Sequence, residues 1–264
     1  MNSSEANRVF KINVIWFLVP VILFLCTVSC QRSADFLKAT ATTYRHDLEI
    51  GVSANDLLTS SKYKSLSIEV QYLSPDYKPD SRAFDHLKSL LEQRLNKPEG
   101  VSIVARQIYP STLNFGIDQI KSIEETSRTE FTQGSRLAVY ILYLNGYYTP
   151  DTLVLGAAYR NTSIVVFGKS INDYAVGDSL KKLAFDATVM EHEFGHLLGL
   201  VGQATPALTD HKDGVNGNHC TNKDCLMYYS FLDSFDSTQY AGGLSSVPAL
   251  DSACIADLRS NGGR

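Results

Sequence analysis

The strongest constraint on this 264-residue chain is the run HEFGH at residues 192–196, which lies inside a longer helical pattern. The apolar residues that recur at helical spacing around it are Leu180, Leu183, Ala184, Ala187, Met190, Phe194 and Leu197. They predict one amphipathic helix, capped by Asp178 or Ser179, whose apolar side packs into the core. Because positions i and i+4 share a helix face, His192 and His196 would present two imidazoles one turn apart. The run therefore favours a metal site with a carboxylate beside it, and two surface histidines are the alternative.

Two histidines do not complete a catalytic zinc site, which takes three protein ligands and leaves one position open. No glutamate follows Glu193, so a glutamate ligand from a downstream helix is excluded. The later histidines are His211 and His219, and an aspartate ligand from Asp210 or Asp213 lacks a supporting motif. His211 lies in a polar run that also fits a solvated loop. The residues alone leave the third ligand open.

Residues 192–199 read HEFGHLLG and resemble HExxHxxG, the opening motif of the metzincin zinc peptidases. Gly199 would let the chain turn out of the helix, but Gly202 stands where the third histidine of that motif is expected. Residues 219–227 read HCTNKDCLM and resemble HCx4CxM, the continuation in archaemetzincins. The resemblance implies that His219 is the third ligand, displaced by an insertion of roughly 17 residues (219 − 202). His211 is the alternative.

The same resemblance implies further roles in the site. Met227 would be the Met-turn methionine beneath the zinc ligands, and Tyr229 would lie near the zinc and assist the oxyanion, as in astacin-like enzymes. Glu193 would take the proton from a zinc-bound water and pass it to the leaving amine. An extended substrate would pair with an edge strand at residues 152–159, where Gly156 and Ala157 permit close approach.

We therefore expect a zinc-dependent peptidase with one catalytic zinc ion and a protein or peptide substrate. Two other functions remain open. One is a non-catalytic binding lipoprotein on a metalloprotease scaffold, and the other is a zinc amidase that acts on a non-peptide substrate.

The N-terminus resembles a bacterial lipoprotein signal. Arg8 and Lys11 precede an almost wholly apolar stretch at residues 12–28, and Ser29-Cys30 resembles the end of a lipobox. We expect a signal peptide at residues 1–29, lipidation of Cys30, export, and anchoring in a bacterial outer membrane on its periplasmic or cell-surface face. A simple secretory signal and an uncleaved anchor helix are the alternatives.

Export suggests an oxidising compartment, in which cysteines form disulfides. Cys220 and Cys225 close a small loop and are the predicted pair, which leaves Cys254 alone and buried. These thiols could instead bind a second metal. An all-cysteine site is not predicted, because no CxxC follows.

The remaining pattern favours an α/β (α+β), metzincin-like fold with a mixed, twisted sheet. The predicted strands are residues 66–73, 101–109, 136–144, 152–159 and 163–170, and the further helices are 81–96, 116–131 and 248–258. We expect a tether at 30–65 and a catalytic domain at 66–264, with an upper lobe at 66–199 and a lower lobe at 200–264. The net charge of −4, without a basic run, argues against nucleic acid, and we expect a monomer.

Overall fold

The computed structural model describes residues 44–110, 115–205, 207–230 and 242–264. Residues Tyr44–Arg264 form one compact unit, so the second half of the 30–65 segment packs as part of it. Among the described residues, no helix is both long and apolar enough to cross a membrane. The predicted signal peptide and the predicted lipidation site Cys30 lie outside the described residues.

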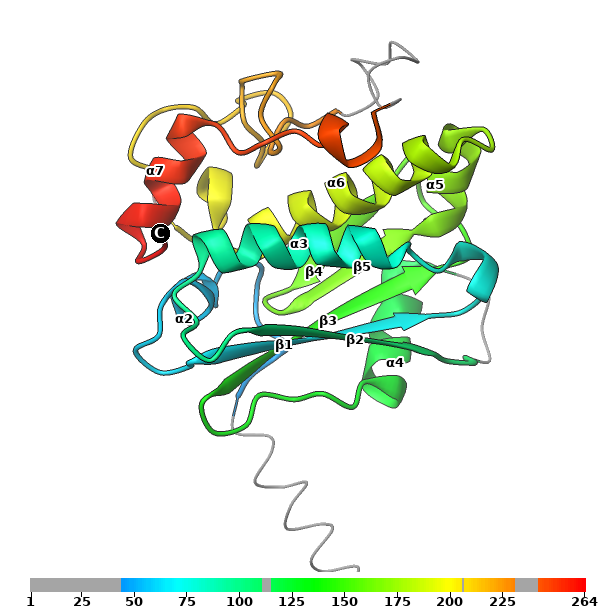
Figure 1. Ribbon diagram of the computed structural model, residues 1–264, viewed down its shortest axis with the longest axis horizontal. Helices are drawn as coiled ribbons and strands as arrows, with labels where there is room; N and C mark the ends of the chain where they lie inside the picture. The colour runs from blue at the N-terminus through cyan, green and yellow to red at the C-terminus, as the bar shows by residue number, and fades with distance from the viewer. Residues whose placement is uncertain (1–43, 111–114, 206, 231–241) are drawn as a thin grey trace, which may run out of the picture. The chain divides into compact units, whose positions relative to one another are not determined.

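A five-stranded mixed sheet with the order β2-β1-β3-β5-β4 forms the centre of this unit (Figure 1). The strands are β1 Ser65–Tyr72, β2 Val101–Gln107, β3 Arg136–Leu144, β4 Gly156–Arg160 and β5 Ser163–Phe167. Four of them run parallel, and β4 pairs antiparallel with β5 at one edge. The expected mixed α/β fold is confirmed, with β3 in the buried centre and β4 at an edge.

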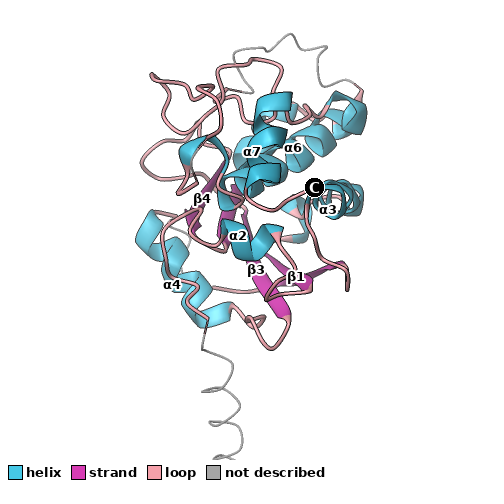
Figure 2. Cartoon of the chain, turned by 90° about the vertical axis from the view of Figure 1, so that its left-hand side faces the viewer, coloured by secondary structure: helices cyan, strands magenta, loops and turns pink. Residues whose placement is uncertain are grey.

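Helices cover both faces of the sheet, as the side view shows (Figure 2). Alternate residues of β3 enter two separate clusters: Val139, Ile141 and Tyr143 join one, and Tyr140 and Leu142 join the other. The helices are α2 Ala54–Leu58, α3 Ser81–Arg94, α4 Ile117–Ser127, α5 Gly168–Ala175, α6 Ser179–Leu197 and α7 Ser252–Ser260. The larger cluster contains α3 and α6, and the smaller contains α4. Each β3 side chain therefore packs against helices on its own face of the sheet.

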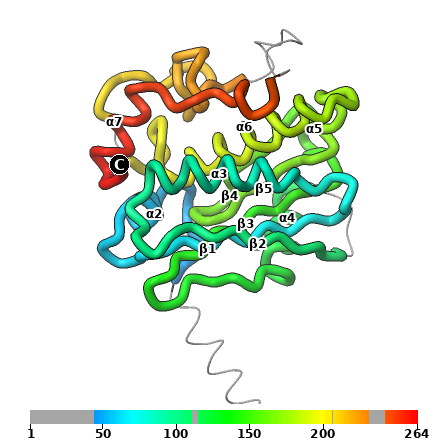
Figure 3. The backbone as a smooth tube through the Cα atoms, viewed as in Figure 1, coloured from blue at the N-terminus to red at the C-terminus, as the bar shows by residue number. Residues whose placement is uncertain are grey.

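Helix α6 carries the HEFGH run and is buried without a break from Leu183 to Leu197. Its start is fixed by Asp178, whose carboxylate accepts hydrogen bonds from the backbone N–H groups of Leu180 (2.9 Å) and Lys181 (3.1 Å). The chain from the 3-10 turn η3 Gly243–Ser246 to α7 runs along the outer side of α6 (Figure 3), and η3 packs on α6. The helix is thus enclosed between the sheet and the C-terminal segment.

Helix α4 and the edge of the sheet are joined by buried ion pairs. The Glu124 carboxylate contacts Arg128 at 2.7 Å and Arg160 of β4 at 3.0 Å. It also accepts a hydrogen bond from the Ser163 hydroxyl at 2.6 Å. Because a buried carboxylate without partners is costly, these contacts keep α4 and β4 in a defined relation. They position the edge strand that borders the site.

Several predicted boundaries are wrong in detail. The strand expected at 163–170 ends at Phe167, because α5 begins at Gly168, where a Cβ atom would collide with the Tyr143 ring. The strand expected from residue 152 begins at Gly156. The helix expected at 81–96 ends at Arg94 and is capped by Asp80, and the C-terminal helix begins only at Ser252, after its cap Asp251. Short polar caps and turn geometry decide these limits, and periodicity does not report them.

Gly199 ends α6 with a φ of 81°, and a Cβ atom there would collide with the Thr205 hydroxyl. We expect Gly199→Ala to lower the free energy of unfolding by about 2–4 kcal/mol, from left-handed strain together with overpacking. Two variants separate these causes. Gly100 also has a positive φ but open space around it, so Gly100→Ala should cost only about 1 kcal/mol. Gly214→Ala should stay within about 0.5 kcal/mol of wild type. Urea denaturation measures all three, and equal losses at Gly199 and Gly100 would contradict the packing argument.

Candidate metal centre

The structure brings three histidines together at one point. His192 and His196 come from the buried second half of α6, and His219 comes from the loop that follows it. One ring nitrogen from each lies within 4.8 Å of the other two, and the Nε2 atoms of His192 and His196 are 3.2 Å apart. The His219 ring centroid is 5.3 Å from each of the other two rings. His211, the alternative third ligand, lies in a different cluster.

Hydrogen bonds on the far side of the rings set two of the tautomers. The Nδ1–H of His192 donates to the Leu226 carbonyl at 2.7 Å, and the Nδ1–H of His219 donates to the Asn216 carbonyl at 2.7 Å. A carbonyl only accepts, so each Nδ1 carries the proton and each Nε2 keeps a lone pair. These two hydrogen bonds therefore leave the Nε2 lone pairs of His192 and His219 available to a metal ion.

Burial keeps the two helix histidines neutral. It lowers the pKa of His192 to about 3, against the opposing effect of the Leu226 hydrogen bond. Burial also lowers the pKa of His196 well below its usual value, and the neighbouring His192 and His219 add to this effect. Neutral imidazoles whose lone pairs face one another repel unless a cation or a proton lies between them. The donor set thus fits zinc, which is bound by neutral histidine.

Glu193 lies beside this centre and contacts the edge strand. Its Oε2 accepts a hydrogen bond from the backbone N–H of Ala158 at 2.7 Å. Burial raises the pKa of Glu193 to about 8, although the Ala158 hydrogen bond opposes the shift. A Cβ atom at Gly156 would lie 2.5 Å from Val189 Cγ1 and 3.1 Å from Glu193 Cγ. Because Gly156 has no side chain, β4 can pack closely against α6.

Met227 packs under the helix that carries the ligands. It is fully buried, and a Cβ atom on Gly195 would collide with its sulfur. The Met227 carbonyl accepts a hydrogen bond from the backbone N–H of Cys220 at 2.7 Å. The two ends of the HCx4CxM segment are thereby joined beneath the site. Tyr229 is 37% exposed, and its ring centroid is 6.5 Å from that of His219.

The disulfide predicted between Cys220 and Cys225 is wrong. Cys220, Cys225 and Cys254 are all free thiols and all buried. The sulfur of Cys225 is 3.7 Å from that of Cys254, and the sulfur of Cys220 lies beside His211 at 3.5 Å. Helix α7 brings Cys254 into this group. The sequence analysis predicted that Cys254 would be alone, and that prediction is wrong. A contact between residues this far apart in the chain has no signature in local spacing.

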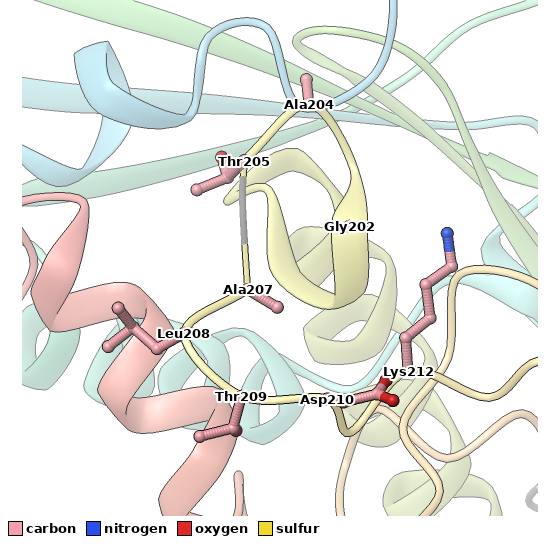
Figure 4. A pocket seen from close by; sticks show the side chains of 8 residues that line it. All are labelled: Gly202, Ala204, Thr205, Ala207, Leu208, Thr209, Asp210 and Lys212. Atoms are coloured by element: carbon pink, nitrogen blue, oxygen red, sulfur yellow. The ribbon is translucent and has the colours of Figure 1, made fainter.

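The turn after α6 is left-handed at position 202, where the metzincin resemblance places a histidine. Val201 and Gly202 have φ angles of 52° and 84°, a left-handed conformation that favours glycine. The chain leaves the helix here and lines a pocket of about 610 Å³ (Figure 4). Its lining residues are Gly202, Ala204, Thr205, Ala207, Leu208, Thr209, Asp210 and Lys212. None of the three clustered histidines lines this pocket.

Among the comparisons with known proteins, one solved structure supports the fold. No protein-family model matches the chain, and no curated protein matches it. The archaemetzincin structure from Methanopyrus kandleri matches with a TM-score of 0.50 and 14% identity, over 75% of this chain and 96% of that one. The fold is archaemetzincin-like. Metalloproteinase-II from Bacteroides fragilis matches with a TM-score of 0.41 and 14% identity, over 85% of this chain and 60% of that one.

We expect His219→Ala to weaken zinc binding at the three-histidine centre by roughly 100-fold or more, because two imidazoles cannot complete the site. A chelator competition titration measures this. His86→Ala is the matched control, since His86 is half-buried and pairs with Glu191 at 2.5 Å outside the cluster. Unchanged zinc affinity in His219→Ala would exclude His219 as the third ligand.

Proposed function

We propose that this chain is a zinc-dependent peptidase whose metal ligands are His192, His196 and His219. The observation that carries the proposal is the convergence of three imidazoles, two of them on the helix that also carries Glu193. Glu193 and two of the ligands share one buried helix, so their relative positions are rigid. The archaemetzincin-like fold supports the same assignment.

Zinc held there would supply Lewis-acid chemistry, acidifying a water molecule and polarising the scissile carbonyl. The protein's own contribution to proton transfer is Glu193. Its Oε2 is held by the Ala158 N–H, which leaves Oε1 to accept a proton from the attacking water. The same carboxyl then delivers that proton to the nitrogen of the leaving amine. A raised pKa near neutrality suits a group that must both accept and release a proton.

An extended peptide is the substrate form that the surroundings favour. Strand β4 pairs with β5 on one side only and is the edge of the sheet beside Glu193. An edge strand offers backbone groups to which an extended chain can add. Tyr229, exposed and near His219, is positioned to contact the substrate or the developing oxyanion.

Glu193→Gln tests the catalytic proposal. We expect it to lower kcat/KM on a peptide library by at least about 100-fold, because the amide cannot accept the proton, with zinc content unchanged. Glu191→Gln is the control, since Glu191 is a buried glutamate of the same helix that contacts His86 instead. Equal, negligible turnover by wild type and Glu193→Gln on peptides would exclude a peptidase. Turnover of non-peptide amides alone would identify an amidase.

We also propose that the chain is exported and anchored through a lipid on Cys30. The support is the charged and apolar pattern of residues 1–29 followed by Ser29-Cys30. Cys30→Ala should abolish incorporation of a labelled fatty acid. Cys26→Ala, a cysteine inside the apolar stretch, is the control. Lipid labelling that persists in Cys30→Ala would contradict the assignment.

A further inference from the structure

We propose that Asp213 is a positioning residue for His219 and acts on it through Asn216. The inference rests on the proposed function, because it takes His219 to be the third zinc ligand. The two other ligands are fixed by the buried helix α6. His219 is only half-buried, and the described residues 207–230 around it form no helix and no strand beyond isolated bridges. Its ring must therefore be held in a defined direction by contacts within the loop.

The loop around His219 closes on itself at Asp213. The backbone N–H of Asp213 donates to the His219 carbonyl at 2.7 Å. Beside this pair, Lys212 and Cys220 form an isolated antiparallel bridge. Residues 213–219 therefore form a short loop whose two ends are tied together, with Asp213 opposite the proposed ligand.

The carboxylate of Asp213 holds Asn216 inside this loop. Its Oδ1 accepts hydrogen bonds from the backbone N–H groups of Val215 at 2.8 Å and Asn216 at 3.1 Å. Its Oδ2 accepts from the side-chain amide of Asn216 at 2.7 Å. Hydrogen bonds to a carboxylate are stronger than those between neutral groups. Because Asn216 is held through both its backbone and its side chain, its backbone is kept in one conformation.

Asn216 in turn orients the ring of His219. Its carbonyl accepts the Nδ1–H of His219 at 2.7 Å. Asp213 therefore acts on His219 at two points, since its N–H holds the His219 backbone and its carboxylate holds the residue that orients the ring. The bond to Asn216 also keeps the proton on Nδ1, whereas a histidine without such a partner favours the proton on Nε2. Asp213 thus supports the tautomer whose Nε2 can bind a metal ion.

The role of Asp213 is indirect. Among the described residues, Asp213 belongs to none of the groups whose donor atoms lie within 4.8 Å of one another. Both of its carboxylate oxygens accept hydrogen bonds from within the loop. Asp213 and Asn216 lie in the segment between Gly202 and His219, so this support belongs to the displaced ligand.

The zinc affinity of three Asp213 variants tests the proposal, measured by chelator competition on the full chain. Asp213→Ala removes the carboxylate hydrogen bonds and should weaken zinc binding by roughly 10–100-fold. Asp213→Asn keeps an acceptor for the backbone N–H groups and should weaken binding by less than about 10-fold. Asp213→Glu keeps the charge but moves the carboxylate by one methylene, so it should weaken binding nearly as much as Asp213→Ala does.

A second readout uses the metal-free protein and needs neither zinc nor activity. Proton–nitrogen NMR correlations, recorded at a pH where the imidazoles are neutral, report which ring nitrogen carries the proton, and His219→Ala identifies the signals of His219. Wild type should show His219 protonated on Nδ1, and Asp213→Ala should shift the population toward protonation on Nε2. His211 is the internal reference, because its Nε2–H donates to Asp257 at 2.8 Å and should not change.

Asp210→Ala is the matched control. Asp210 is an exposed aspartate that precedes Asp213 by three residues and lines the pocket beside Gly202. Its variant should leave both the zinc affinity and the His219 tautomer as they are in wild type. If Asp213→Ala does not fold, the other two variants carry the test, and Asp213→Asn should then bind zinc more tightly than Asp213→Glu.

Three results would overturn the proposal. One is a zinc affinity and a His219 tautomer in Asp213→Ala that equal those of wild type. Another is wild-type affinity in Asp213→Glu, because charge and not position would then be responsible. The third is an equal loss of affinity in Asp210→Ala and Asp213→Ala. Failure of the proposed function looks different, since wild type would then bind no zinc at the three histidines, while the His219 tautomer would still depend on Asp213.

Discussion

The burial of α6 between the sheet and the C-terminal segment is the interaction on which the site depends. Because the helix is enclosed from Leu183 to Leu197, the imidazoles of His192 and His196 have no freedom to move apart. The same burial shifts the pKa values of the histidines downward and that of Glu193 upward. Neutral imidazoles and a carboxyl with a raised pKa are therefore consequences of packing.

The loop that follows α6 supplies the third histidine of the cluster, His219. Gly199 ends the helix in a left-handed conformation, and the chain returns through His219 to Met227, which packs under Gly195. The three-histidine cluster and the methionine that packs under α6 are thus joined through one segment of the chain.

Much of the fold could be read from periodicity. The alternation at residues 66–73 and the apolar run at 136–144 predicted β1 and the central β3, and the helical spacing around the HEFGH run predicted α6 with its cap. Helix α5 was missed, because the apolar run from Ser163 continues past Phe167 and conceals the turn at Gly168. Tyr143 packs where a side chain on Gly168 would stand, and that contact is between distant residues.

What the sequence by itself determined is the local chemistry: two histidines and a glutamate on one helix face, a glycine to end that helix, and an HCx4CxM segment further on. Helical periodicity is a property of neighbouring residues, so it can be read along the chain. Only the tertiary structure decided which distant residues meet. It placed His219 beside His192 and His196. It also placed His211 against the Cys220 sulfur, and it brought Cys225 next to Cys254 and not next to Cys220. The contact between Cys225 and Cys254 depends on how α7 packs against the loop that follows α6. The spacing of these residues along the chain does not determine how far apart they lie in the fold.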